Sequence, residues 1–187
     1  MSKVRKVVVL LTSLVVSAGV GVYAAFQLSP WPMVWLVRHA FDQGAQDAAA
    51  SISGLVPQGI SAQRRLSYAP DDGDAWFDVF APSAQSALPA IVWVHGGGFI
   101  AGTRSDLSGY LQVLAARGYV TVAIDYSTAP EARFPTPVRQ TNLALSYLVA
   151  NAQRFKLDPE RIFSGRRFSR RADRRAVGLD DLRFELR

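Results

Sequence analysis

The residues with the clearest chemical meaning are His95-Gly96-Gly97-Gly98-Phe99, which directly follow an apolar run at 88–94. Three consecutive glycines cost backbone entropy and contribute no packing, so this position must need an exposed backbone with unusual dihedral angles. Amides without side chains approach a substrate oxygen closely and stabilise negative charge that develops on it in a transition state. The residue types therefore favour a site for a transient oxyanion, and we expect these amides to lack partners within the fold.

Two other interpretations of the loop are a simple glycine-rich turn and a phosphate-binding loop. A phosphate-binding loop would end in Lys followed by Ser or Thr, or would show the Gly-x-Gly-x-x-Gly spacing, and neither pattern is present. The loop instead follows a predicted strand and precedes a predicted helix. That context places the glycines at the carboxyl edge of a parallel strand, where open α/β sheets bind ligands. We therefore favour the oxyanion interpretation.

The elements that must position this loop alternate between strands and helices. Short strands are predicted at 64–68 and 75–80, and buried strands at 88–94 and 119–124. A further β segment begins at 161–163. Strands that alternate with helices predict an α/β fold, in which a mixed, mostly parallel sheet is flanked by helices.

Two helices are predicted between these strands. The first covers 106–117, with Ser105 as its N-cap and Gly118 as its stop. The second has Thr136 as its N-cap and Pro137 at its first position. The apolar stripe predicted to continue from this second helix onto the sheet consists of Val138, Leu145, Leu148, Ala152 and Phe155.

Residues 64–163 resemble the N-terminal half of an α/β-hydrolase, specifically the hormone-sensitive-lipase-like esterases and carboxylesterases. The His-Gly-Gly-Gly loop of that family is matched by 95–98, and its Asp-Tyr-x-x-Ala-Pro-Glu segment by 125–131, followed by Phe134-Pro135. The Asp-Pro-Glu-Arg-Ile sequence at 158–162 is similar to the lead-in to the strand that carries the family's nucleophile. The resemblance implies a partial α/β-hydrolase domain, which we assign to 61–163.

The resemblance also implies roles for particular residues. Gly97 and Gly98 would donate the oxyanion-hole amides, while His95 and Gly96 would support the loop. Asp125 would hold local structure by hydrogen bonds, because the catalytic acid of these hydrolases follows the nucleophile in the chain. A small ester or acyl ester is the implied substrate, with no cofactor and no metal. The sequence has no Cys, which excludes a disulfide scaffold and any Cys-ligated metal site.

The sequence departs from the family pattern in two places. Ser127-Thr128 stand where the family usually has Arg-Leu, which leaves the local salt bridging open. No Gly-x-Ser-x-Gly occurs and no histidine follows His95, so one copy of the chain cannot supply a Ser-His-Asp triad. We therefore expect an ester hydrolase by family, in a chain that is itself an inactive fragment. The alternative is a non-catalytic, membrane-anchored binding or interaction module.

Residues 164–187 are predicted to be a disordered or frame-shifted tail. They hold eight Arg and four acidic residues, so that 13 of the 21 Lys+Arg and 11 of the 15 Asp+Glu remain in 1–163. Codons can be chosen for 165–176 that, read one base later, encode Ala-Gly-Asp-Ser-Ala-Gly-Ala-Gln-Ile-Ala-Ala-Gln, which contains the missing nucleophile motif. Clustered Arg also suits nucleic acid or anionic lipid. We expect no nucleic-acid partner, because no folded motif accompanies the cluster.

Residues 1–38 are predicted to be a signal anchor or a signal peptide. After three cations an uncharged run extends over 7–37, and its part at 7–26 is long enough to span a membrane. The three cations before the run and the single Arg38 after it favour an extracytoplasmic domain. Cleavage after 22–24 would instead release a secreted or periplasmic protein. We favour the uncleaved anchor, because the run is longer than a leader requires.

The end of the apolar run carries its own signals. Pro30 and Pro32 predict a break in the helix, and Trp31 and Trp35 suit the headgroup level of a bilayer. Residues 39–60 are rich in Ala, Gly, Ser and Gln and carry no clear chemistry. We interpret them as a linker or cap-like segment, or as a loosely packed helix.

Overall fold

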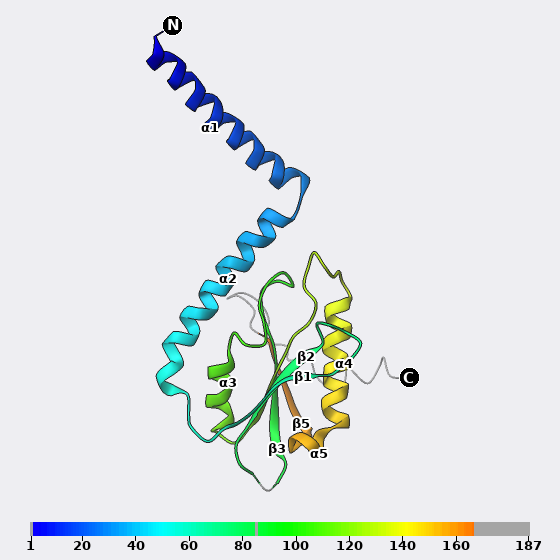
Figure 1. The fold of residues 1–187 in the computed structure, drawn as a ribbon. Helices are drawn as coiled ribbons and strands as arrows, with labels where there is room; N and C mark the ends of the chain where they lie inside the picture. Colours follow the sequence, from blue (N-terminus) through cyan, green and yellow to red (C-terminus); the bar gives the residue numbers. More distant parts are fainter. Residues whose placement is uncertain (1, 85, 167–187) are drawn as a thin grey trace.

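A five-stranded sheet carries the part of the chain that contains the predicted motifs. This computed structural model describes residues 2–84 and 86–166, and its strands are β1 (Ser61–Ser67), β2 (Trp76–Ala81), β3 (Leu88–Val94), β4 (Val120–Ile124) and β5 (Leu157–Arg166). Their order across the sheet is β1-β2-β4-β3-β5 (Figure 1). β3 runs parallel to β4 and β5, whereas β2 is antiparallel to β1 and β4. The predicted mixed sheet is confirmed.

Helices flank the sheet on both faces, as predicted. α3 (Ser108–Ala115) follows β3, whereas α4 (Thr136–Ala150) and the short α5 (Ala152–Phe155) follow β4. Figure 1 shows α3 and α4 on opposite sides of the strands. Each crossover therefore covers one face of the sheet and returns the chain to a parallel strand.

Two separate cores result from this arrangement. On the α3 face, Leu111 and Ala115 lie one turn apart and pack against Phe80 and Ala123. The core on the α4 face is larger. Its buried members from the two helices are Ala144, Leu148, Ala152 and Phe155, and they pack against the buried residues of β2, β3 and β4. Their spacing of four, four and three residues gives a single apolar stripe.

An aromatic cluster fills the centre of the larger core. Phe77 on β2 is 1% exposed, and its ring meets the rings of Tyr147 and Phe155 edge to face, with 5.6 Å between centroids in each pair. Edge-to-face contact is favoured by the charge distribution of aromatic rings. The cluster joins the middle of the sheet to both α4 and α5.

Three details of the predicted helices are wrong. Ser105 is not an N-cap, because α3 begins only at Ser108 and has no side-chain cap. Thr136 is the first residue of α4 and its side chain does not cap the helix, since Pro135 takes the N-cap position. Val138 is 38% exposed, and Pro137 is buried in its place. The periodicity of the sequence predicted the apolar stripe of α4, but it did not predict at which residue either helix begins.

β5 runs past the predicted boundary of the domain. The predicted segment at 161–163 lies inside a strand that starts at Leu157 and continues through Ser164 and Gly165 to Arg166. These last residues pair with β3, for example Val92 with Ser164. The rest of the predicted tail, 167–187, lies outside the described residues.

Two long helices precede the sheet. α1 (Lys3–Leu28) has a mean hydropathy of 2.2 over its most apolar window and none of that window is buried, so it is long and apolar enough to cross a membrane. α2 (Trp31–Ile52) begins directly after the predicted break at Pro30, and the short helix η1 (Ser53–Leu55) follows it. Most of the segment predicted as a linker or loose helix is therefore helical.

Candidate active site

The glycine loop leaves β3 through a sharp turn with left-handed backbone angles. Gly97 has a φ of 113°, and Gly98 and Phe99 each have a φ of 62°. The turn closes because the amides of Ile100 and Ala101 both donate to the carbonyl oxygen of Gly97, at 3.0 and 3.1 Å. The amides of Gly97 and Gly98 donate to no acceptor among residues 2–84 and 86–166. Two adjacent N–H groups beside the end of β3 thus have no partner among the described residues, with Gly97 buried and Gly98 exposed.

Gly97 is required by the close approach of the backbone as well as by its dihedral angle. A Cβ atom at this position would lie 2.0 Å from the carbonyl oxygen of Ala101, an approach that real Cβ atoms do not make. A Cβ at Gly98 would meet no atom within 4 Å. The turn that presents the two amides therefore tolerates no side chain at the first of them.

His95 is 5% exposed and packs against the buried side of the glycine loop. Its ring stacks on the ring of Tyr126 with 4.1 Å between centroids, and the Tyr126 hydroxyl donates to the carbonyl oxygen of His95 at 2.9 Å. The His95 Nδ1 lies 2.9 Å from the carbonyl oxygen of Gly96. Since a carbonyl oxygen only accepts hydrogen bonds, Nδ1 must carry the proton. The imidazole is used to hold the turn.

Arg104 fixes the far side of the loop to two carboxylates. Its Nε donates to the Asp78 Oδ1 at 2.9 Å, and its Nη1 donates to the Asp125 Oδ2. The amide of Arg104 also donates to the Asp125 Oδ1 at 2.6 Å. Burial lowers the pKa of the Arg104 guanidinium, but the hydrogen bonds to both carboxylates outweigh burial and raise the pKa above its usual value. The segment after the glycines is therefore anchored to the sheet.

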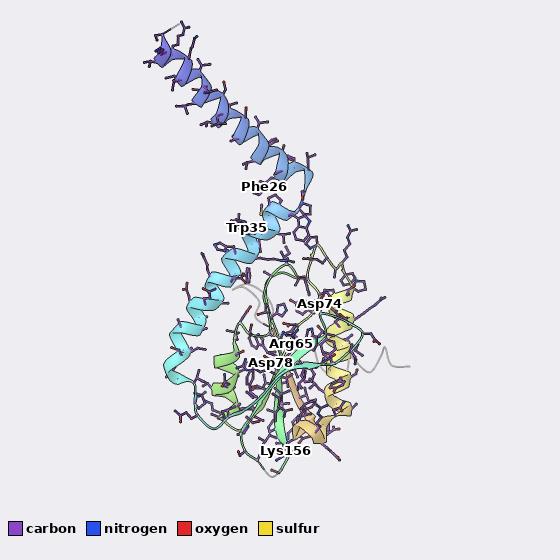
Figure 2. All side chains as sticks on the ribbon, in the orientation of Figure 1. Phe26, Trp35, Arg65, Asp74, Asp78 and Lys156 are labelled. Atoms are coloured by element: carbon purple, nitrogen blue, oxygen red, sulfur yellow. The ribbon has the colours of Figure 1, made fainter. Side chains whose placement is uncertain are left out.

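Asp78 and Asp125 both serve this anchoring. Asp78 is 2% exposed on β2, and the amide of Arg65 also donates to its Oδ1 at 2.8 Å. Figure 2 shows Asp78 inside the domain with Arg65 beside it. The carbonyl oxygen of Asp125 accepts from the Tyr68 hydroxyl at 2.8 Å, and burial raises the pKa of that phenol. Asp125 thus makes hydrogen bonds through both its carboxylate and its carbonyl oxygen.

Arg38 of α2 holds the loop from the opposite direction. Its Nε donates to the carbonyl oxygen of Ile100 at 2.9 Å, and its Nη2 donates to the carbonyl oxygen of Ala129 at 3.0 Å. The two Nη atoms also bind both carboxylate oxygens of Glu131, at 3.0 and 2.8 Å. These hydrogen bonds lower the pKa of Glu131 and raise the pKa of Arg38. One guanidinium therefore joins α2, the glycine loop and the segment at 128–131.

At Ser127, where the family usually has Arg, hydrogen bonds to a glutamine and to a carboxylate take the place of a salt bridge. The Gln140 Oε1 accepts from the amide of Ser127 at 2.8 Å, and the Gln140 Nε2 donates to the Asp72 Oδ2 at 2.7 Å. The Ser127 hydroxyl donates to the Asp74 Oδ2 at 2.7 Å. Local salt bridging is supplied instead by Arg38 and Glu131.

The register of the sheet brings the end of β5 to the same place. Val94, the last residue of β3, pairs with Arg166, the last residue of β5. Because the strands are parallel, the chain leaves β5 beside the point where His95 and the glycines leave β3. Two cavities of about 180 and 310 Å³ lie along α2 and not over the glycine loop. The described residues contain no cluster of side chains that could hold a metal ion.

Known proteins share this arrangement. A family model described as BD-FAE matches residues 77–165. An acetyl esterase of Salmonella paratyphi B is 33% identical over 95 residues, which are 50% of this chain and 29% of that protein. Over this region the chain is similar to α/β-hydrolase esterases.

Solved structures of α/β-hydrolase esterases agree with the fold. A hyperthermophilic esterase from the archaeon Pyrobaculum calidifontis superposes with a TM-score of 0.60 at 25% identity, over 71% of this chain and 43% of that one. A bacterial heroin esterase gives a TM-score of 0.54 at 28% identity, over 67% and 42% of the two chains. The chain thus spans less than half of the length of these relatives.

Sequence reasoning found the glycine loop but missed the residues that hold it. The sequence marks Arg38 only as a charge that flanks the apolar run, and Tyr126 only as part of a family motif. It assigns no role to Arg104 or Asp78. The one signal that the sequence offers is Asp78 itself, a carboxylate between Phe77 and Val79 in a predicted strand, which implies a partner cation if the strand is buried.

Substituting the two glycines in turn tests the geometry of the loop. Gly98→Ala places a Cβ in open space, so we expect a cost of roughly 1–2 kcal/mol from the left-handed backbone alone. Gly97→Ala adds a clash with the Ala101 carbonyl, so we expect a clearly larger loss in the free energy of unfolding. Urea unfolding of both variants measures the difference. Equal losses would show that the turn differs from the one described.

The Arg38–Glu131 pair predicts a pH-dependent contribution to stability. Because the pKa of Glu131 is lowered from 4.5 in the folded state, its contribution is complete above that pH and disappears as the pH falls through the lowered pKa. We expect Glu131→Gln to lower the free energy of unfolding by at most about 1 kcal/mol at about pH 7, since the pair is partly exposed, and by less at about pH 3, where protonation of Glu131 has begun to remove its contribution.

Urea unfolding at the two pH values measures this contribution. Glu160→Gln is the matched control, because the exposed carboxylate of Glu160 makes no ion pair among the described residues. An effect of Glu131→Gln that stays constant on acidification would contradict the assignment.

Proposed function

We propose that this protein derives from carboxylic-ester hydrolases and that Gly97 and Gly98 form their oxyanion hole. The observation that carries the proposal is the pair of amides at the end of β3, which have no acceptor among the described residues and lie beside the end of β5. Relatives named acetyl esterase and heroin esterase support an ester substrate.

The proposed chemistry is acyl transfer through a tetrahedral intermediate. A nucleophile delivered from the end of β5 attacks the ester carbonyl, and the oxygen that becomes negatively charged receives hydrogen bonds from the amides of Gly97 and Gly98. The intermediate collapses by breaking the bond to the alcohol, which leaves, while the acyl group stays on the nucleophile. Water then attacks this acyl group, releases the acid and regenerates the nucleophile. His95 takes no part as a base, because its Nδ1–H is bound to the Gly96 carbonyl and its ring is buried under Tyr126.

We expect the chain as given to be nearly inactive. It contains no Gly-x-Ser-x-Gly, and His95 is the last histidine of the sequence. Loss of triad members lowers kcat by on the order of 10⁶-fold in a well-studied serine protease. The proposed explanation is a shift of reading frame near residue 165, since the adjacent frame can encode Gly-Asp-Ser-Ala-Gly from position 166 onward.

Restoring the frame tests both parts of this proposal. We expect the gene to encode the nucleophile motif in the adjacent frame, and we expect the frame-restored protein to hydrolyse a p-nitrophenyl ester and to react with a fluorophosphonate probe. The chain as given is the matched control and should remain unlabelled. An adjacent frame without the motif would remove the frame-shift explanation, and an unreactive restored protein would remove the hydrolase assignment.

The N-terminal helix is proposed to anchor the protein, with the sheet domain outside the cytoplasm. α1 has the length and composition of a membrane span, and it is followed by a break and two tryptophans. We expect the chain extracted from membranes to keep its N-terminal residues, as measured by intact-mass spectrometry. A mature protein that begins near Ala25 would show instead that the helix is a cleaved leader.

A further inference from the structure

The end of the domain that carries the glycine loop is held against the start of α2. Arg38 lies only seven residues after Trp31, a separation of about 10 Å along a helix that rises about 1.5 Å per residue. The Arg38 guanidinium binds the Ile100 carbonyl at 2.9 Å and also lies 5.9 Å from the centre of the Trp31 ring. The loop is therefore close to the point where α1 ends.

The two ends of the domain differ in their distance from that point. Figure 2 shows Phe26 and Trp35 together at the junction of α1 and α2, and Lys156 at the opposite end of the domain. Figure 1 shows that α4 begins at the end near the junction. Arg38 donates hydrogen bonds to Glu131, which lies in the segment at 128–135. This segment leads directly into the same end of α4.

Large apolar side chains are exposed around this end, and we call them the apolar rim. Phe134 is 85% exposed in the segment before α4. The members on α2 are between about half and two-thirds exposed, and they are Trp31 at 51%, Met33 at 52%, Trp35 at 66% and Leu36 at 49%. A group of exposed apolar side chains of this size marks a contact surface.

A lipid surface is the occupant that fits the rim. α1 is apolar on all sides, and only Ser29 and Pro30 separate it from α2, so the rim continues a surface that already suits hydrocarbon. Trp31 and Trp35 combine an apolar ring with a polar N–H, which favours the headgroup level. Arg38 then fixes the sheet domain to α2, so the glycine-loop end of the domain stays beside the tryptophans of that helix.

We propose that the apolar rim lies on the membrane surface and that the glycine-loop end of the sheet faces the bilayer. The proposal goes beyond ester hydrolysis, and it rests on the membrane span proposed above for α1. Phe134 reaches the headgroup region together with the α2 members of the rim. The end of the domain that carries α5 and Lys156 points away from the membrane.

Site-specific fluorescence tests this orientation, because the absence of Cys makes each introduced thiol unique. The full chain is reconstituted in nanodiscs and labelled with an environment-sensitive dye at one of three exposed positions. Arg133→Cys reports on the rim while leaving Phe134 in place. Gln153→Cys on α5 is the matched control at the far end, and Val16→Cys reports on the middle of α1.

Quenching by lipid nitroxides gives the readout. We expect the dye at position 133 to lose most of its emission with a headgroup nitroxide, the dye at 153 to lose none, and the dye at 16 to respond to a nitroxide in the acyl chain. Quenching at 16 without quenching at 133 would overturn the orientation alone. No quenching at 16 would overturn the span and the proposal with it, while esterase activity of the frame-restored protein would be judged separately.

The same labels distinguish lipid from a second copy of the chain. If the rim binds another copy, the dye at 133 is shielded in detergent micelles at high protein concentration and is released on dilution. That result, combined with an absence of headgroup quenching, would also overturn the proposal. Phe134→Ser should weaken the quenching at 133 and leave that at 16 unchanged.

Discussion

A buried carboxylate on β2 is the constraint on which the geometry of the site depends. Asp78 is 2% exposed, and leaving such a charge without its partner costs about 3–5 kcal/mol. Arg104 is the cation that meets it most closely, and the same guanidinium also binds Asp125 at the end of β4. The segment that follows the glycines must therefore return to the sheet at Arg104, which limits the paths that the loop can take.

The loop is fixed from two sides by side chains that take no part in the proposed chemistry. Arg104 ties its far end to the sheet, and Arg38 ties the Ile100 carbonyl to α2. His95 and Tyr126 fill the space beneath it. With these contacts in place, the left-handed turn at Gly97 is set before any ligand arrives. Preorganised donors of this kind need no rearrangement when charge develops, which is what makes them effective.

The sequence predicted the features that depend on local pattern. β3 matches the apolar run at 88–94, and the alternation of elements was enough to predict the mixed sheet and its flanking helices. It did not predict the contacts that orient the loop, because these join residues far apart in the chain. Arg38 and Glu131 are 93 residues apart, and no periodicity relates them. Helix starts also differed by a few residues, since turn hydrogen bonds such as those between Thr103 and Asp106 competed with the expected cap.

The pairing of β3 and β5 gives the frame-shift interpretation a structural meaning. Val94 and Arg166 are paired, so the residues that follow each of them emerge at neighbouring points. A serine encoded at position 168 by the adjacent frame would come two residues after the end of β5. A nucleophile motif requires such a strand-to-turn position, and the strand that would lead to it ends beside the strand that leads to Gly97 and Gly98. An unrelated Arg-rich sequence is not expected to encode this motif in an adjacent reading frame directly after β5. The agreement between codon arithmetic and strand pairing therefore favours a common origin for the loop and the shifted motif.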